Sequence, residues 1–167
     1  MDFFEVVLNR RSVRKFKDMD IPEEMINQIL TAGIWAPSGM DNQPWRFAVI
    51  RDKELKSEIA KLTKHKAILE NAPVIIPVFV DHNVTYNTVK DAQTMGACLQ
   101  NMLLAIHALG LVGVWIGEIL KNGDKVVEIC CAPKKYELMA VICVGYSAEL
   151  PKKGKRKGLD EVVFLRK

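Results

Sequence analysis

Two nearly unbroken apolar runs constrain the fold of this chain more than any other feature. They cover residues 73–80 and 138–144, and each has the length of one strand. Strands that are covered on both faces have such continuous apolar sequences. Between the two runs, residues 91–109 have the length and composition of a long buried helix, and Gly110 follows as a helix stop. We therefore predict a sheet with these two strands in its middle.

The rest of the chain indicates an alternation of helices and strands. Pro22, followed by two acidic residues, predicts a helix start, because a missing amide and negative charge both suit a helix N-terminus. Further predicted elements are a short helix over 2–9, a helix from 20 to about 33–37, a strand at 46–50, a helix from 52 and a small-residue segment at 111–117. Residues 147–167 are predicted to be an extended arm, because their apolar residues 162–165 lie beyond the compact core.

Length and charge narrow the class of protein. With 167 residues, of which 49% are hydrophobic, residues 1–167 have the size of a single domain with a full core. The formal net charge of +4 is concentrated in residues 10–17 and 152–157. Neither cluster interleaves aromatic residues for base stacking, so a basic nucleic-acid-binding module is the less favoured alternative.

The cysteines and the apolar segments point to the cytoplasm. Cys98, Cys130, Cys131 and Cys143 show no C-x-x-C spacing, and we predict that they are buried free thiols. Residues 1–14 lack the apolar core of a signal peptide. The polar residues within 92–109 would be costly in lipid. The sequence therefore predicts a cytoplasmic protein that has neither a metal site nor a membrane partner.

Three guanidinium groups and a hydroxyl fall within five residues near the start of the chain: Arg10, Arg11, Ser12 and Arg14. Guanidinium groups pair with phosphate oxygens through two parallel hydrogen bonds, and a serine hydroxyl can add another. A basic run taken alone is most often a solvated surface. Phosphate binding becomes the preferred interpretation because of the motifs that follow.

Residues 36–45 form a second motif, in which two prolines and a glycine stiffen a loop that displays two carboxamides, a hydroxyl and an indole ring. Carboxamides both donate and accept hydrogen bonds, which is what the edge of a heterocyclic ring requires. An ordinary polar turn with Trp45 in the core is the competing interpretation.

These segments resemble the flavin-dependent nitroreductase family. The resemblance begins with Arg-Arg-Ser-x-Arg-x-Phe at 10–16 and Ala-Pro-Ser-x-x-x-Asn-Gln-Pro-Trp at 36–45. It continues through the helix and the Gly-Leu-Val-Gly-Val-Trp-Ile-Gly segment of residues 91–117, and through the basic stretch before residues 159–163. Four segments in the same order span nearly the whole chain.

The resemblance implies an α+β fold with three layers, in which helices flank a central mixed β-sheet. It also implies an intertwined homodimer with one FMN in each of two sites at the subunit interface, the arm of residues 147–167 reaching the other subunit. By position, the first motif would hold the phosphate, ribityl chain and pyrimidine edge, and a residue of the arm would add positive charge. The cofactor-binding residues implied are Arg10, Arg11, Ser12, Arg14, Pro37, Ser38, Gly39, Asn42, Gln43, Ile116, Gly117, Lys155 and Arg156.

Within this set, Pro37–Gly39 would come from the other subunit, and Ile116 and Gly117 would turn backbone N–H groups toward the reactive ring edge. Which basic residue of 152–157 contacts the phosphate stays open. Arg14 is the candidate to stabilise the negative charge that reduced flavin gains near N1.

The implied activity is hydride transfer from NADH or NADPH through flavin N5 to a nitroaromatic, quinone or similar small acceptor, in two successive half-reactions. No catalytic side chain is required, because the cofactor carries the chemistry. The absence of Gly-x-Gly-x-x-Gly indicates that the nicotinamide donor binds transiently. A flavin-binding redox protein or sensor with little turnover is the alternative.

Two departures from the family pattern leave the substrate class open. Val112 stands where a glycine is common, and the chain lacks the insertion that larger members place over the site. Trp115 stays open between core packing and a wall beside the flavin. Three separated histidines, three methionines and two acidic residues are predicted to have structural or surface roles: His65, His82, His107, Met95, Met102, Met139, Asp91 and Glu118.

Overall fold

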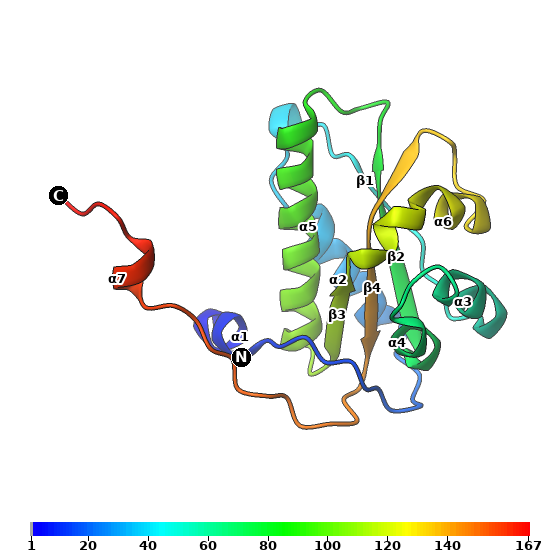
Figure 1. The fold of residues 1–167 in the computed structure, drawn as a ribbon, viewed down its shortest axis with the longest axis horizontal. Helices are drawn as coiled ribbons and strands as arrows, with labels where there is room; N and C mark the ends of the chain where they lie inside the picture. Colours follow the sequence, from blue (N-terminus) through cyan, green and yellow to red (C-terminus); the bar gives the residue numbers. More distant parts are fainter. Residues whose placement is uncertain (1) are drawn as a thin grey trace.

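A four-stranded sheet is the centre of the computed structural model, which describes residues 2–167 (Figure 1). Its strands are β1 (Trp45–Phe47), β2 (Val74–Asp81), β3 (Val112–Ile116) and β4 (Tyr136–Gly145), in the spatial order β1-β2-β4-β3. All eight residues of β2 are buried. The prediction that the two apolar runs are the central strands is confirmed.

The three strand pairs are all antiparallel, and β2 pairs with β4 along its whole length. Within residues 2–167 the four strands thus form an antiparallel sheet and not the expected mixed one, and the parallel contact between Ser12 and Gly113 is an isolated bridge on the outer edge of β3. The predicted strand at 46–50 is shorter than expected. It ends at Phe47, and Ile50 makes only an isolated bridge to Ile75.

Helices cover both faces of the sheet and form the other two layers (Figure 1). Those anticipated from the sequence begin close to the expected residues, and Asp2, Asp52 and Asn87 cap three of them through side-chain oxygens. Smaller helices fill the connections. The helices are α1 (Phe3–Asn9), α2 (Glu23–Ile34), η1 (Gly39–Asp41), α3 (Lys53–Ala60), α4 (Lys66–Asn71), α5 (Thr88–Ala108), η2 (Glu118–Asn122), α6 (Gly123–Ile129) and α7 (Leu159–Val162).

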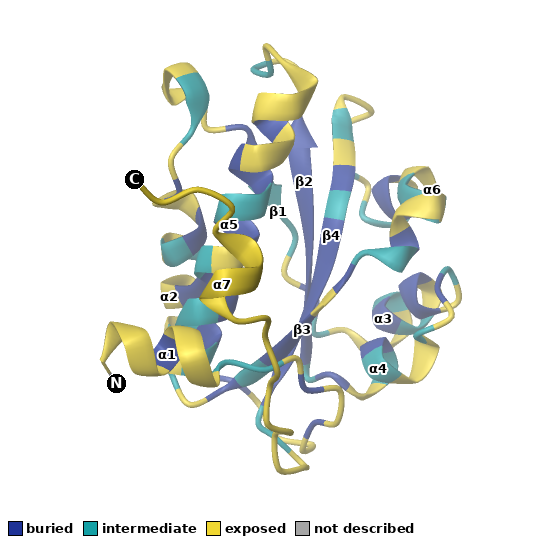
Figure 2. Cartoon of the chain, turned by 60° about the vertical axis from the view of Figure 1, so that its left-hand side comes forward, coloured by how far each residue is buried: buried dark blue, intermediate teal, exposed yellow. Residues whose placement is uncertain are grey.

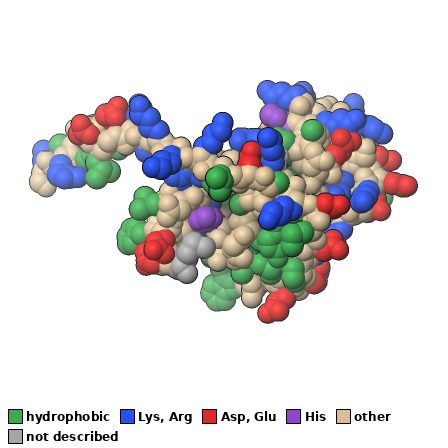
Figure 3. All heavy atoms as spheres, turned by 90° about the horizontal axis from the view of Figure 1, so that it is seen from below, with side chains coloured by type: hydrophobic (Ala, Val, Ile, Leu, Met, Phe, Trp, Pro, Cys, Tyr) green, Lys and Arg blue, Asp and Glu red, His purple; other side chains and the backbone are tan. Residues whose placement is uncertain are grey.

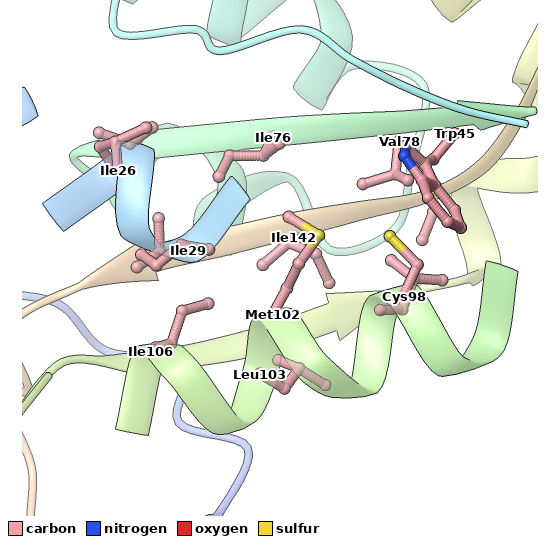
Figure 4. Close-up of a cluster of buried hydrophobic side chains, with 14 of the residues drawn as sticks. Ile26, Ile29, Trp45, Ile76, Val78, Cys98, Met102, Leu103, Ile106 and Ile142 are labelled. Atoms are coloured by element: carbon pink, nitrogen blue, oxygen red, sulfur yellow. The ribbon is translucent and has the colours of Figure 1, made fainter. Parts of the chain in front are cut away.

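Two apolar clusters hold these layers together. On one face, α2 and α5 pack on the sheet through residues such as Ile26, Met102 and Ile142 (Figure 4). On the other face, the sheet packs against α3, α4 and α6. Met95 and Met102 are fully buried, as predicted for core residues, and Met139 is half-buried against the first cluster.

The small-residue segment at 111–117 forms β3, the edge strand that the sequence pattern did not predict as a strand. Its glycine explains the difference. A Cβ on Gly113 would lie 2.9 Å from the main-chain oxygen of Cys143 and 3.3 Å from Ile106 Cδ1, so only glycine allows β3 to fit between β4 and α5. Glycine is uncommon inside strands, so Gly113 makes this segment look unlike a strand in the sequence. The tight packing of β3 nevertheless requires a glycine at this position.

The carboxy-terminal arm extends away from the body in Figure 1 and carries α7 near its end, and Figure 2 colours the arm as exposed. Every residue from 148 to 167 is exposed, and Phe164 is 99% exposed. The helix α1 adds exposed apolar side chains, with Phe4 68% and Leu8 66% exposed. The predicted extended arm is confirmed as a shape, and its contact with a second subunit stays a prediction.

The cysteine prediction is correct for one pair and wrong for the other. Cys98 and Cys143 are buried, and burial raises the pKa of Cys98 to about 12. Cys130 is half-buried and Cys131 is exposed, because the chain leaves α6 through a left-handed residue, Cys131, with φ of 50°. All four thiols are free.

None of the helices within residues 2–167 is both long and apolar enough to cross a membrane. The location in the cytoplasm stays a prediction.

We predict that Gly113→Ala destabilises the protein by about 1–3 kcal/mol, the usual cost of overpacking a tight site. The added methyl group would meet the rigid backbone of β4 as well as Ile106. Urea unfolding measures the loss. Gly123→Ala is the matched control, because its Cβ would lie 3.5 Å from Leu138 Cβ, an ordinary contact, within a helix. Equal stability of the two variants would contradict the prediction.

Candidate functional site

The arginine run lies along the free edge of β3. Val13 is 2% exposed, and its N–H donates to the oxygen of Gly113 at 3.2 Å. In extended chain, neighbouring side chains point to opposite sides. Ser12 and Arg14, which precede and follow the buried Val13, accordingly both point away from the core and are exposed. The edge strand thus fixes the position of the whole basic motif.

The two basic clusters meet, although they lie at opposite ends of the sequence. A Cβ on Gly154 would lie 2.7 Å from Arg11 Cζ, so the arm passes directly over this guanidinium. The pKa of Arg10 is lowered by burial and by the positive charges of Arg11 and Arg156. Arg10, Arg11 and Arg156 therefore form one cationic group, and its role in binding a phosphate stays a prediction. Lys155 is exposed, and its main-chain oxygen accepts a hydrogen bond from Arg156 Nη1 at 2.8 Å.

Two buried nitrogens in this group have no hydrogen-bond partner among residues 2–167: Arg10 Nη1 and Arg11 Nε. Buried polar atoms without partners are rare and point to a missing ligand or water. No ion pair within the described chain joins a carboxylate to Arg10, Arg11 or Arg156. A phosphate dianion would satisfy both the orphaned donors and the crowded positive charge.

A surface hollow of about 740 Å³ adjoins the cationic group. Figure 3 shows blue side chains continuing from the arm onto the body of the molecule. One wall comes from residues 11–15, a second from α4 and a third from the arm. The lining residues include Ser12, Arg14, Ala67, Ile68, Asn71, Lys152 and Lys153. The hollow therefore extends from the cationic group toward Arg14, the residue predicted to meet the pyrimidine edge.

The carboxamide loop is a strained and tightly anchored structure. Met40, Asp41 and Gln43 have positive φ values of 55°, 54° and 43°, which are uncommon for residues other than glycine. Gly39 lies against Tyr86 so closely that no Cβ would fit. Strain of this kind is found at functional sites, where surrounding contacts enforce it.

Asp91 anchors this loop and was missed by sequence reasoning, which gave it a cap or surface role. It is 3% exposed and accepts hydrogen bonds from Asn42 Nδ2 at 2.8 Å, Tyr86 N at 3.0 Å and Asn87 N at 2.8 Å. Burial raises the pKa of Asp91, but the hydrogen bonds from Asn87, Asn42 and Tyr86 outweigh it and lower the pKa overall. An isolated acidic residue in a largely apolar helix was the sequence feature that could have indicated this anchoring role.

The anchoring limits which groups of the loop are free for a ligand. Asn42 Nδ2 also donates to Val84 O at 3.0 Å, while the buried Asn42 Oδ1 has no partner within residues 2–167. Gln43 Nε2 donates to Asp41 Oδ1 at 2.9 Å on the surface. Pro37 is exposed, and Ser38 and Gly39 are half-exposed. Ser38 Oγ accepts a hydrogen bond from Gln43 N at 3.3 Å, and Asn42 Nδ2 is bound within the loop region, so these groups serve largely to hold the loop itself.

The far end of β3 offers main-chain groups at the sheet edge. Since the oxygen of Gly113 points to the free edge, alternation along the strand turns the N–H groups of Trp115 and Gly117 to the same edge. Ile116 is 2% exposed, and its side chain belongs to the core cluster on the other face. Trp115 is 40% exposed, so the core-packing alternative for this residue is wrong.

Glu118 fixes the end of this edge. It accepts hydrogen bonds from Thr63 Oγ1 at 2.6 Å and Lys64 N at 3.2 Å, and it pairs with Lys121. The contacts with Lys121 and Thr63 lower the pKa of Glu118 to about 2. The predicted cap or surface role is therefore incomplete, because Glu118 ties the segment after β3 to the turn after α3.

The carboxamide loop and the arginine group lie at opposite ends of α5 (Figure 1). Asn42 contacts Asp91 in the first turn of α5, while Arg10 and Arg11 lower the pKa of His107 in its last turn. Sixteen residues of helix separate Asp91 from His107, a rise of about 24 Å. Within one copy, the structure does not bring the two predicted halves of the site together.

No group of three or more His, Cys, Asp or Glu side chains within residues 2–167 is placed to hold a metal ion.

Fold and site together define an α+β protein with a divided, phosphate-compatible ligand site. The family model described as Nitroreductase family matches residues 7–69 and 61–146. A candidate NADH dehydrogenase/NAD(P)H nitroreductase from Methanothermobacter thermautotrophicus is 35% identical over 153 residues, which cover 90% of this chain and 80% of the relative. The chain therefore belongs to the nitroreductase family.

Solved structures agree with this assignment. A candidate nitroreductase from Desulfovibrio desulfuricans, crystallised in complex with FMN, is 40% identical, with a TM-score of 0.93 over 98% of this chain and 96% of that one. The NADPH:FMN oxidoreductase from Vibrio harveyi, complexed with NAD+, is 26% identical, with a TM-score of 0.88 over 98% of this chain and 76% of that one. The predicted nitroreductase fold is confirmed.

We predict that Asp91→Asn destabilises the protein by about 1–3 kcal/mol at neutral pH, because a carboxamide cannot accept all three hydrogen bonds and leaves buried donors unpaired. The folded-state pKa of Asp91 is depressed. Its contribution is therefore complete above about pH 4, the unfolded pKa, and is lost as the pH falls through the folded pKa.

Urea unfolding at a fixed protein concentration, at pH 7 and near pH 3, measures this effect. The difference between wild type and Asp91→Asn is expected to shrink at the lower pH. Asp41→Asn, at an exposed position in the same region, serves as the control. A difference that grows on acidification would show that the carboxylate is not the stabilising form.

Proposed function

We propose that this protein is an FMN-dependent NAD(P)H oxidoreductase that passes hydride to a small acceptor, at a site completed by a second copy of the chain. As a member of the nitroreductase family it is a flavin-dependent oxidoreductase. The observation that carries the proposal is the convergence of Arg10, Arg11 and Arg156 around two buried nitrogens without partners. A terminal phosphate of a cofactor is the ligand that this chemistry fits.

In the proposed site, Arg10, Arg11 and Arg156 hold the phosphate, with Ser12 adding a hydroxyl donor and Lys155 adding charge. Arg14, which lies in the adjoining hollow, faces the pyrimidine edge, where a guanidinium would favour the reduced cofactor. The N–H of Gly117 at the free edge of β3 is the donor proposed for the reactive ring edge. Ile116 contributes only its main chain, since its side chain is buried elsewhere.

FMN, when bound, supplies hydride transfer at N5 between a nicotinamide donor and an acceptor. The protein residues bind and orient, and none of them needs to act as an acid, base or nucleophile. The sequence contains no Gly-x-Gly-x-x-Gly motif, so NADH or NADPH is proposed to bind transiently and to leave before the acceptor enters. A nitroaromatic or quinone is the proposed class of acceptor, in a ping-pong reaction.

A homodimer is proposed because one copy keeps the two halves of the site apart. In a dimer with the two α5 helices antiparallel, Pro37, Ser38, Gly39, Asn42 and Gln43 of one copy would approach the arginine group of the other. The exposed apolar side chains of α1 and of the arm support such an interface, since monomeric soluble proteins rarely expose large apolar patches. The arm of residues 147–167 is proposed to reach the second subunit.

We predict that Arg10→Ala combined with Arg156→Ala raises the Kd for FMN by at least about 100-fold, because each charge-assisted hydrogen bond is worth about 1.5–3 kcal/mol. Titration of the apoprotein, followed by flavin fluorescence, measures the change. The control is Lys134→Ala combined with Lys125→Ala, which removes the same charge from exposed positions near α6. Undiminished FMN binding in the arginine variant, with normal unfolding, would refute the phosphate assignment.

We predict that freshly purified protein carries flavin, and that NADH or NADPH bleaches its visible absorption under anaerobic conditions within the turnover time. Rapid mixing, followed by addition of a nitroaromatic or quinone, measures both half-reactions. Fast bleaching without reoxidation by either acceptor class would contradict the proposed acceptor. Slow bleaching by both donors would favour the alternative of a flavin-binding redox protein or sensor.

A further inference from the structure

A small internal cavity lies beside the cationic group, between the last turn of α5, residues 9–13 and the arm. Its volume is about 40 Å³. A buried water requires roughly 10–15 Å³ of such space, so the cavity has room for about three oxygen-sized atoms. Its polar lining comes from Asn9, Arg10, Arg11 and His107, and the rest is apolar or main chain. The cavity is small and mostly apolar, and its polar side chains come from these four residues.

Three buried side-chain nitrogens from residues that line this cavity have no hydrogen-bond partner within residues 2–167. They are Arg10 Nη1, Arg11 Nε and His107 Nε2. Each buried unpaired polar atom costs about 1–3 kcal/mol, so three from residues around one cavity point to a missing ligand or water. The first two belong to the proposed phosphate site, whereas His107 was predicted to be structural or on the surface.

We infer that His107 is a third ligand of the cofactor phosphate, donating from Nε2 beside Arg10 Nη1 and Arg11 Nε. The inference rests on the proposed function, since it names a further residue of the same site. A protonated imidazole donates from both ring nitrogens and carries a charge that a dianion stabilises. His107 therefore binds the phosphate as imidazolium, and FMN binding takes up a proton.

The electrostatic surroundings determine the direction of this coupling. The titratable and charged groups facing His107 are Arg10 and Arg11 from the amino-terminal segment, with Arg156 of the arm behind Arg10. No carboxylate lines the cavity; α5 and β3 contribute Leu103, Ile106 and Val112. Burial and the two arginines lower the pKa of His107 in the free protein. A dianion bound between these groups would offset the positive charge of the two arginines and raise the pKa of His107.

The expected result is that FMN binds more tightly as the pH falls from 8.5 to 6.5, by up to about 10-fold per pH unit between the free and bound pKa values of His107. Titration calorimetry in two buffers of different ionisation enthalpy measures the proton uptake directly. NMR of the wild-type histidine rings, with and without FMN, gives the shift of His107 without any variant.

The variant His107→Gln keeps a donor of similar reach and removes the titration, and His107→Ala removes both. At pH 6.5 we expect His107→Ala to raise the Kd for FMN about 10-fold or more, the value of one charge-assisted hydrogen bond, and His107→Gln to abolish most of the proton uptake. Riboflavin, which lacks the phosphate, is expected to bind all three proteins equally. The control His82→Gln lies near the other end of α5, on an exposed ring, and should match wild type.

Each outcome separates this inference from the proposed function. Wild-type protein that binds no FMN at all would refute the proposed function itself. Wild-type FMN binding with an unchanged Kd and proton uptake in both His107 variants would refute the inference and leave the function standing. Equal weakening of FMN and riboflavin would assign His107 a purely structural role, and an unshifted His107 resonance in the wild type would overturn the inference even if neither variant folded.

Discussion

Mutual repulsion among Arg10, Arg11 and Arg156 is the constraint on which the proposed site depends. The amino-terminal segment is held by its bridge to β3, and the arm brings its own cations to the same place. Like charges crowded in a partly buried position disfavour the fold unless an anion lies between them. This unfavourable electrostatic energy is confined to one small region, and a bound phosphate would lower it. Cofactor binding and stability are in this way linked.

The edge strand β3 connects this charged region to Gly117, the donor proposed for the reactive ring edge. Gly113 allows β3 to lie close to β4 and α5, Val13 pairs with its outer edge, and Glu118 fixes the segment beyond it. One short strand therefore sets both the register of the arginines and the direction of the main-chain donor at Gly117. A shift of β3 by one residue would turn Trp115 into the core and Ile116 out of it.

The sequence predicted the central strands, the long helix and the residues of both motifs, because each rests on a local pattern. It did not predict β3 as a strand, since Gly113 obeys a packing requirement from Cys143 and Ile106 that no local pattern records. Asp91 and His107 were assigned structural or surface roles for a similar reason. Asp91 contacts Asn42, and His107 feels the charge of Arg10, and both partners are far away in the sequence. The resemblance, and no local pattern, placed Pro37–Gly39 on the other subunit, and the separation of the two motifs along α5 is compatible with that expectation.

The arm combines five cations at 152–157 with an apolar tip at 162–165, and this order affects how a single copy behaves in solution. In a single copy these apolar side chains are exposed to solvent, and in the proposed homodimer the second subunit would cover them. Charged residues that flank an apolar segment reduce its tendency to aggregate. The lysines beside Arg156 would therefore lower the tendency of a single copy to aggregate, besides adding positive charge near the proposed phosphate site.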